Sequence, residues 1–405
     1  MRNVAAAALV AFAPAWLPPV ARAAPDEEAL GKAEGYPVCP PSARIEMRCI
    51  VGMVSRRDEV AAARKVPRGD AVRPLLRAGE EPAFRYRWRG AERGLDDYLA
   101  DHRTTGLLVL KGGTILAERY QYERTPAHRM TSMSMAKTVV AMLVGIALEE
   151  GAIRSIDDPA ERYVPGLAGT AYGATALRHL LSMSSGVRFS ETYNGADDVA
   201  LLARLSLLGR SAGGVATLRP FDTRERAAGE RFKYASSETQ VLGLALRAAT
   251  GKPLAEYLSE KIWQPMGAEA DATWLVDRGG YEAAFTGLNA TVRDYGRLGL
   301  LLANDGAVGD RQLIPAAWVR AATTPPAAHF APGRVPGLFG YGYQTWVLPG
   351  ARRQFALRGV RGQFVFVDAA AKVVMVHTAA GEIGTPVGEL VTLWTRVAES
   401  QMKPD

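Results

Sequence analysis

Histidine and cysteine are scarce in this 405-residue chain, which contains five histidines and two cysteines. A transition-metal centre needs several such ligands at close spacing. The histidines are dispersed without paired helical spacing; they are His102, His128, His179, His329 and His377. The sequence therefore predicts no metal site and no cofactor.

Long hydrophobic runs, repeats and low-complexity tracts are also missing. After the first twenty residues, no uninterrupted apolar segment reaches the roughly 20 residues that a membrane-spanning helix needs. The formal charge of +7 is dispersed rather than gathered with aromatic residues, which does not favour nucleic-acid binding. With 48% hydrophobic and 22% charged residues, the composition is that of a globular protein. Nothing in it indicates an oligomeric state.

The N-terminus has the pattern of a secretory signal. Arg2 is followed by an apolar stretch to Val20, and Ala21–Arg22–Ala23 supplies the small residues of a cleavage site. Prolines interrupt the stretch, so it does not predict a transmembrane helix. We expect residues 1–23 to be removed near Ala23, and the mature protein to be periplasmic or secreted.

Export affects how the two cysteines are interpreted. Cys39 lies in a proline-rich stretch, and Cys49 follows ten residues later. In an oxidising compartment this pair predicts a disulfide that fixes an N-terminal arm, residues 24–95. In a cytosolic protein the same residues would remain two unlinked thiols.

Two pairs of strands are predicted. Residues 107–110 and 114–117 are apolar runs on either side of Lys111–Gly112–Gly113, a tight glycine turn. Residues 363–367 and 373–376 form a second pair of the same kind.

Helical patterns separate and follow these strands. Helical periodicity prevails in residues 166–285, and residues 387–399 form an amphipathic pattern that would cover a sheet. This order predicts an α/β fold with an antiparallel sheet flanked by helices and an inserted, mainly helical domain. We assign residues 96–165 and 286–405 to the α/β domain and 166–285 to the insertion.

A serine and a lysine three residues apart open a strongly apolar helical run. Ser134 and Lys137 share one helix face, and the helical run after Lys137, residues 138–148, is apolar all round, which predicts burial. A serine hydroxyl needs a neighbouring base to attack a carbonyl, and burial lowers the pKa of a lysine. The pattern indicates a nucleophile with a lysine base; the alternative is an exposed lysine on a solvated helix face.

A second serine motif competes with this one. Gly209–Arg210–Ser211–Ala212–Gly213 matches the Gly-x-Ser-x-Gly elbow of α/β-hydrolases, which requires a strand before the serine and a helix after it. Residues 197–208 instead have helical spacing. We therefore interpret Ser211 as a loop serine.

Ser134–Met135–Ala136–Lys137 and Tyr234–Ala235–Ser236, in this order, resemble the serine β-lactamase and penicillin-binding-protein superfamily. Further segments are similar to its 6-aminohexanoate-dimer (nylon-oligomer) hydrolases and family VIII carboxylesterases: 179–187, 191–193, 287–291 and 341–346. The similarity covers about residues 95–400. It implies the β-lactamase/transpeptidase-like version of the predicted α/β fold.

The third sequence box of that superfamily is altered. Its usual basic and hydroxyl residues grip a β-lactam carboxylate, whereas this chain has Leu357–Arg358–Gly359 followed by Val360–Arg361–Gly362–Gln363. Nylon-oligomer hydrolases carry a similar Gly-x-x-Gly-Gln sequence. The resemblance therefore implies an amidase or esterase acting on a small molecule.

The resemblance also implies an acyl-enzyme mechanism. Ser134 attacks an ester or amide carbonyl, Lys137 takes its proton, and Tyr234 relays that proton to the leaving group. Backbone N–H groups of Ser134 and Val360 form the oxyanion hole. The substrate-binding residues implied are Tyr193, Ser236, Asn289, Trp346, Gly359 and Gln363. Ser236 is expected to steady Lys137.

Two other functions stay open. A D,D-carboxypeptidase or class C-like β-lactamase on the same fold would turn over a chromogenic cephalosporin but not simple esters. A non-catalytic sensor or binding module would keep the fold alone, although the presence of Ser134, Lys137 and Tyr234 argues against it.

Overall fold

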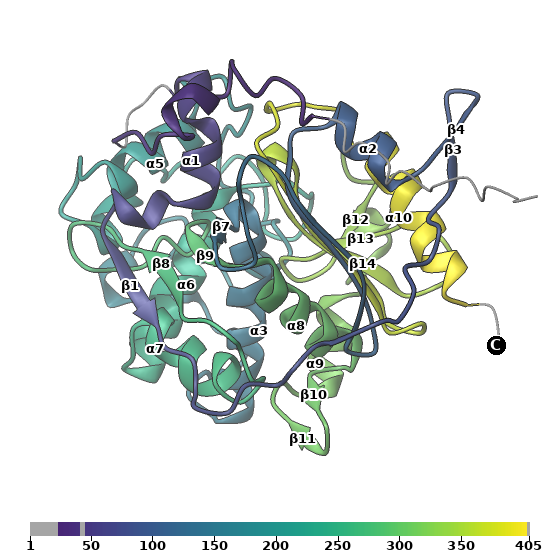
Figure 1. The fold of residues 1–405 in the computed structure, drawn as a ribbon. Helices are drawn as coiled ribbons and strands as arrows, with labels where there is room; N and C mark the ends of the chain where they lie inside the picture. Colours follow the sequence, from purple (N-terminus) through teal and green to yellow (C-terminus); the bar gives the residue numbers. More distant parts are fainter. Residues whose placement is uncertain (1–22, 41–44, 403–405) are drawn as a thin grey trace, which may run out of the picture.

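The computed structural model describes residues 23–40 and 45–402 (Figure 1). The predicted secretory signal, apart from Ala23, lies outside the described residues. Within those residues, no helix has the length and apolar character needed to cross a bilayer.

The described chain contains both helices and strands. The helices are α1 (Ile50–Ser55), α2 (Leu95–Asp101), α3 (Ala136–Glu149), α4 (Leu177–Leu181), α5 (Asp198–Leu207), α6 (Ser236–Thr250), α7 (Leu254–Leu258), α8 (Val292–Ala303), α9 (Ala316–Ala322) and α10 (Gly388–Ser400). The strands are β1 (Ala63–Val66), β2 (Leu76–Arg77), β3 (Tyr86–Trp88), β4 (Ala91–Arg93), β5 (Thr104–Lys111), β6 (Thr114–Tyr120), β7 (Arg129–Thr131), β8 (Ala272–Leu275), β9 (Leu288–Thr291), β10 (Ala307–Val308), β11 (Arg311–Gln312), β12 (Gly340–Tyr341), β13 (Trp346–Val347), β14 (Gln354–Gly359), β15 (Gln363–Asp368) and β16 (Val373–Ala379).

A large sheet forms the centre of the molecule. Its strand order among the described residues is β12-β13-β14-β15-β16-β5-β6-β2, antiparallel throughout except where β2 meets β6. The two predicted strand pairs are the hairpins β5–β6 and β15–β16, so both predictions are confirmed.

Helices cover both faces of this sheet (Figure 1). Because side chains alternate along a strand, Leu108 and Leu110 of β5 pack in one core with α3, α6 and α8. Leu107 and Val109 pack on the opposite face with α2 and α10. The predicted α/β class, with an antiparallel sheet flanked by helices, is confirmed.

A smaller sheet joins distant parts of the chain. Its order is β1-β8-β9-β7, and β7 leads directly into the predicted nucleophile. Strand β8 lies in the segment predicted as mainly helical but pairs with β9, which lies beyond it. Helix α6 packs against α3 in the same core as α8.

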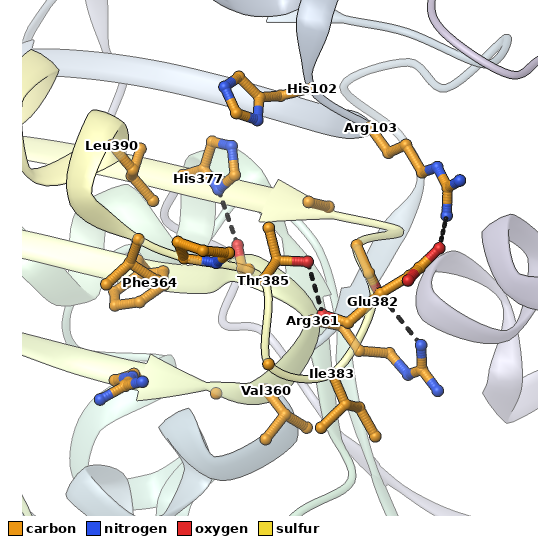
Figure 2. A pocket seen from close by; sticks show the side chains of 18 of the residues that line it. His102, Arg103, Val360, Arg361, Phe364, His377, Glu382, Ile383, Thr385 and Leu390 are labelled. Carbon is orange, nitrogen blue, oxygen red and sulfur yellow. Dashed lines mark hydrogen bonds and ion pairs between the residues drawn. The ribbon is translucent and has the colours of Figure 1, made fainter. Parts of the chain in front are cut away.

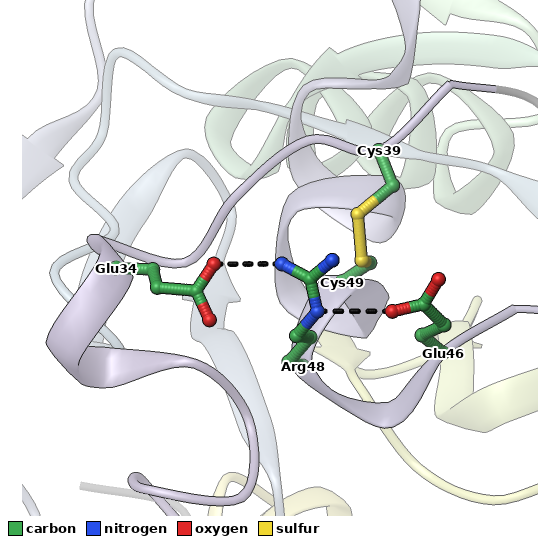
Figure 3. The surroundings of a disulfide bond; sticks show 5 residues. All are labelled: Glu34, Cys39, Glu46, Arg48 and Cys49. Atoms are coloured by element: carbon green, nitrogen blue, oxygen red, sulfur yellow. Dashed lines mark hydrogen bonds and ion pairs between the residues drawn. A yellow bond between two sulfur atoms is a disulfide. The ribbon is translucent and has the colours of Figure 1, made fainter.

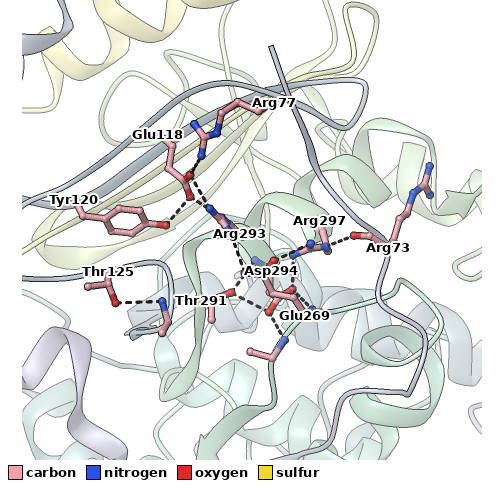
Figure 4. Close-up of polar contacts among 12 residues, drawn as sticks. Arg73, Arg77, Glu118, Tyr120, Thr125, Glu269, Thr291, Arg293, Asp294 and Arg297 are labelled. Atoms are coloured by element: carbon pink, nitrogen blue, oxygen red, sulfur yellow. Dashed lines mark hydrogen bonds and ion pairs between the residues drawn. The ribbon is translucent and has the colours of Figure 1, made fainter. Parts of the chain in front are cut away.

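Helix α8 is fixed beneath the large sheet by a buried polar network (Figure 4). The carboxylate of Asp294 accepts the backbone N–H of Glu269 at 2.9 Å and the Thr291 hydroxyl at 2.9 Å. It also pairs at 2.9 Å with Arg297, whose side chain is only 4% exposed. The network ties the first turn of α8 to the loop before β8.

The N-terminal arm packs beside the nucleophile. Cys39 and Cys49 are bonded to each other, and Arg48 between them pairs with Glu34 and Glu46 (Figure 3). Apolar side chains of the arm form one cluster with residues of the main body: Leu30, Tyr36, Ile50, Val51, Met53, Val54, Tyr122, Met133 and Ala380. Met133 directly precedes Ser134, so the stapled arm supports the nucleophile turn.

Candidate active site

Ser134 lies in a tight turn rather than in a regular helix. The sequence predicts it in the first turn of the apolar helix, but Met133–Met135 form a 3-10 turn and α3 begins at Ala136. Met133 has a left-handed backbone with φ 45°, a conformation that non-glycine residues adopt mainly where function or packing requires it. The Ser132 N–H anchors the turn by donating to Leu288 O of β9 at 2.6 Å.

Lys137 contacts the Ser134 hydroxyl directly. Its Nζ donates to Ser134 Oγ at 2.8 Å and to the carbonyl oxygen of Phe285 at 3.0 Å. The side chain is 1% exposed, and burial lowers the pKa of Lys137 to about 8, with the charge of Glu191 opposing part of that shift. The amine therefore loses its proton at mildly alkaline pH and can then accept one from Ser134.

Tyr234 is the third member of this group. Lys137 Nζ lies 5.0 Å from the centroid of its ring. Burial raises the pKa of Tyr234, an effect that its hydrogen bond with Ser134 partly offsets, so the phenol keeps its proton. The structure thus brings Ser134, Lys137 and Tyr234 together from separate parts of the chain.

Strand β14 lies directly against the nucleophile turn. A Cβ atom at Gly359 would lie 2.5 Å from the carbonyl oxygen of Ser132 and 3.0 Å from the backbone nitrogen of Ser134. Glycine is therefore required here for close approach rather than for its backbone angles, which are extended at φ −125°. The next residue, Val360, lies on the wall of the same cavity as Ser134.

A carboxylate that sequence reasoning left without a role stands beside these residues. Glu191 accepts the Ser236 N–H at 2.8 Å and the Ser236 hydroxyl at 2.9 Å. It also accepts the Tyr193 hydroxyl at 2.6 Å. Ser236, expected to steady Lys137, is bonded to Glu191 instead.

Ser134 opens into a cavity of about 760 Å³, a size typical of small-molecule sites. The end beside the nucleophile is lined by Thr192, Tyr193, Tyr234, Trp346, Arg358 and Gly359. Val360 follows Gly359 in the wall, and Figure 2 shows further lining residues, among them Phe364, His377, Ile383, Thr385 and Leu390. The Arg358 guanidinium lies 5.0 Å from the centroid of the Trp346 ring.

Comparison with known proteins gives the family of this chain. The family model described as Beta-lactamase matches residues 91–394. The chain belongs to the Beta-lactamase family of serine hydrolases. This assignment confirms the resemblance stated from the sequence.

Several relatives of this Beta-lactamase family member are named hydrolases. A 6-aminohexanoate-dimer hydrolase of Paenarthrobacter ureafaciens is 31% identical over 273 residues, which cover 66% of this chain and 64% of the relative. A structure from Bacillus anthracis, provisionally assigned as a 6-aminohexanoate-dimer hydrolase, has a TM-score of 0.79 and 24% identity, covering 89% of this chain and 97% of its own. EstCE1, a hydrolase with promiscuous acyltransferase activity, has a TM-score of 0.55 and 16% identity, covering 74% of this chain and 94% of its own. At these identities the two structures establish the fold alone.

Three predicted substrate-binding residues of this family member, Ser236, Asn289 and Gln363, are buried and do not line the cavity. The Asn289 side chain donates to Thr273 Oγ1 at 3.1 Å and to Gly287 O at 3.0 Å within the small sheet. The Gln363 side chain donates to Ala379 O at 2.7 Å, between strands of the large sheet. Both side chains are buried on strands and form no part of the cavity wall.

Sequence reasoning also missed the roles of two charged side chains in segments that it had noted. Glu191 stands two residues before the noted Tyr193, and Arg358 occupies the altered third box. The Phe285 contact uses a backbone carbonyl, which leaves no signal in residue types. Ser211 follows helix α5, so it lacks the preceding strand of a hydrolase elbow.

Proposed function

We propose that this serine hydrolase cleaves an ester or amide bond of a small molecule through an acyl-enzyme on Ser134. The observation that carries the proposal is the buried Lys137 amine, 2.8 Å from the Ser134 hydroxyl and beside Tyr234. A serine with an adjacent base of lowered pKa is the arrangement that nucleophilic catalysis needs.

The first half-reaction forms the acyl-enzyme. Ser134 Oγ bonds to the carbonyl carbon while its proton passes to Lys137 Nζ. N–H groups of Ser134 and Val360 stabilise the negative oxygen, each donor contributing about 3–4 kcal/mol. When the carbon–oxygen or carbon–nitrogen bond breaks, the leaving group receives the proton from Lys137 through Tyr234.

The second half-reaction restores the enzyme. Water attacks the acyl carbon, and its proton passes to Lys137 by way of Tyr234. The bond to Ser134 Oγ then breaks, the hydroxyl regains its proton, and a carboxylic acid leaves. Tyr193 and Trp346 line the cavity next to Tyr234, where they would contact the leaving group.

We favour esters and linear amides over β-lactams as substrates. The relative that is 31% identical is named for 6-aminohexanoate dimer, a linear amide. In the third superfamily box, a lysine or histidine and then a hydroxyl residue usually precede the glycine. This chain has Leu357 and Arg358 at those two positions. The substrate test below distinguishes this proposal from the D,D-carboxypeptidase and β-lactamase alternatives.

The test is labelling with a fluorophosphonate serine probe, followed by peptide mass spectrometry. We expect label on Ser134, none in Ser134→Ala, and normal labelling in Ser211→Ala, the matched control in the rival motif. Label elsewhere would overturn the proposal. Turnover of p-nitrophenyl butyrate or 6-aminohexanoate dimer, but not of a chromogenic cephalosporin, would support the substrate class, and the reverse pattern would reject it.

We further propose that the enzyme acts outside the cytosol. The bonded cysteines and the basic, then apolar, N-terminal sequence support this placement. Mass spectrometry of the protein from its host should find an N-terminus at Ala24; an uncleaved chain retained in the cytosol would reject export.

A further inference from the structure

One carboxylate joins the segments that carry both tyrosines of the cavity. Glu191 accepts hydrogen bonds from the Ser236 N–H, the Ser236 hydroxyl and the Tyr193 hydroxyl. Within the part of the chain that the structure describes, no lysine or arginine forms an ion pair with it. Its carboxylate is therefore held by neutral donors, and its charge acts on Lys137, whose pKa it raises.

On one side, Glu191 caps helix α6. The helix starts at Ser236, and the residue before it, Ala235, has no side-chain oxygen to accept the first N–H groups. Glu191 supplies that acceptor from a different segment, and a negative charge at a helix N-terminus is stabilising. The cap fixes the turn that carries Tyr234, two residues before Ser236.

On the other side, Glu191 holds Tyr193. The backbone of Tyr193 is left-handed, with φ 60°, and its phenol points back to the Glu191 carboxylate at 2.6 Å. The Tyr193 N–H is fixed separately by Asp197 at 2.6 Å. Both ends of Tyr193 are thus bound, which sets its ring in the cavity wall.

We propose that Glu191 is a positioning residue for the hydrolysis, which holds Tyr234 and Tyr193 in place and stabilises the ammonium formed when Lys137 takes the Ser134 proton. This inference rests on the proposed function. No bond is made to Glu191 during the reaction; it acts through the residues it touches and through its charge. Nothing in the superfamily boxes assigns this role.

The groups facing Lys137 determine the direction of the charge effect. Ser134, the Phe285 carbonyl and the Tyr234 ring surround its amine. Glu191 raises the pKa of Lys137 against the larger effect of burial. Arg358 lowers the pKa of the Tyr234 phenol and, being positive, would not replace the lost negative charge. Removing the charge of Glu191 should therefore lower the pKa of Lys137.

The experiment compares Glu191→Gln and Glu191→Ala with Glu256→Gln, a matched control on the exposed face of α7. The readout is the pH profile of kcat/KM for a neutral ester. We expect the acid limb to move to lower pH in both variants at position 191 and to stay in place in the control. Because glutamine keeps an acceptor for the Ser236 N–H, its plateau should fall on the order of tenfold. Glu191→Ala also releases the turn that carries Tyr234, so its plateau of kcat/KM should fall on the order of a hundredfold.

Unchanged acid limbs in both Glu191 variants would overturn the inference, as would equal plateaus for glutamine and the control. If Glu191→Ala does not fold, the acid limb and the plateau of the kcat/KM profile of Glu191→Gln are sufficient to test the inference. Fluorophosphonate labelling in the same preparations separates the two proposals. Label absent from Ser134 in the unmodified protein rejects the proposed function; label present with unmoved limbs rejects only the role of Glu191.

Discussion

For the single residue Lys137, burial determines the pH at which the enzyme can work. Its pKa is lowered to about 8, and only the neutral amine can accept the Ser134 proton. We expect kcat/KM for a neutral ester to rise about tenfold per pH unit below that pKa and to level off above it. A pH–rate profile with a neutral p-nitrophenyl ester measures this.

A rate that stays flat across that pKa would show that another group is the base. The control is Lys137→Ala, which should lose about 10²- to 10⁴-fold in kcat at every pH and should show no limb at this position.

Gly359 predicts a second effect of a single residue. An alanine Cβ would meet the Ser132 carbonyl at 2.5 Å and push β14 away from the turn of Ser134, separating the two proposed oxyanion donors. We expect Gly359→Ala to lower kcat by about 10²-fold and stability by about 1–3 kcal/mol. Ester kinetics and urea unfolding measure the two losses.

The matched control is Gly79→Ala, where the new methyl group meets nothing within 4 Å. It should leave both kinetics and stability unchanged. Full activity in Gly359→Ala would show that β14 can shift without moving the donors.

The residues proposed for the chemistry of the site could be predicted from the sequence, whereas the hydrogen-bond partners that hold them could not. Ser134, Lys137 and Tyr234 were predicted because nucleophile, base and proton relay need particular residue types in a known order. Ser236 was assigned to Lys137 because sequence gives no distance between a side chain and its partners. Its actual partner, Glu191, lies 45 residues earlier in the chain.

For secondary-structure elements, hydrophobic periodicity carried most of the prediction. Strands β5, β6, β15 and β16 were predicted from short apolar runs, and helix α10 was predicted from apolar residues that recur at helical spacing. The start of α3 was missed because the 3-10 turn around Ser134 depends on tertiary contacts: β14 packs against the turn, and the Ser132 N–H donates to Leu288 O of β9. Asn289 and Gln363 were misplaced because their strands have both faces buried, which leaves no alternation to show where a side chain points.

Helix α8 provides a prediction for a whole element. Asp294 is fully buried and pairs with Arg297, which is 4% exposed. Asp294→Ala would leave that guanidinium without this partner and release the Thr291 cap. We expect the free energy of unfolding to fall by about 3–5 kcal/mol, measured by urea denaturation.

The control for this change is Glu230→Ala, which removes one partner of the exposed pair with Arg226. It should change stability by no more than about 0.5 kcal/mol. Equal effects of the two substitutions would show that the network at α8 contributes little.

For the whole molecule, the fold class followed from the order of the elements, whereas the domain boundaries did not. The division into residues 96–165 with 286–405, and 166–285, stays a prediction. Helices α3, α6 and α8 pack in one continuous core that includes residues of both parts. Strand β8 pairs across the proposed boundary with β9. Long-range pairings of this kind depend on tertiary contacts that local patterns do not encode.

The stapled arm gives the last prediction, because it links the disulfide to the core beside Ser134. The disulfide between Cys39 and Cys49 closes a short loop, and such a bond contributes about 2–4 kcal/mol by restricting the unfolded chain. Tyr36 and Val51 of the arm pack in one cluster with Met133, the residue before the nucleophile. We expect Cys39→Ala with Cys49→Ala to lower the thermal midpoint in calorimetry and to lower kcat, because the nucleophile turn loses support.

Dithiothreitol should reproduce both losses in the unmodified protein and cause no further change in the double variant. A lower midpoint with unchanged kcat would show that Met133 and the turn keep their geometry when the arm is released.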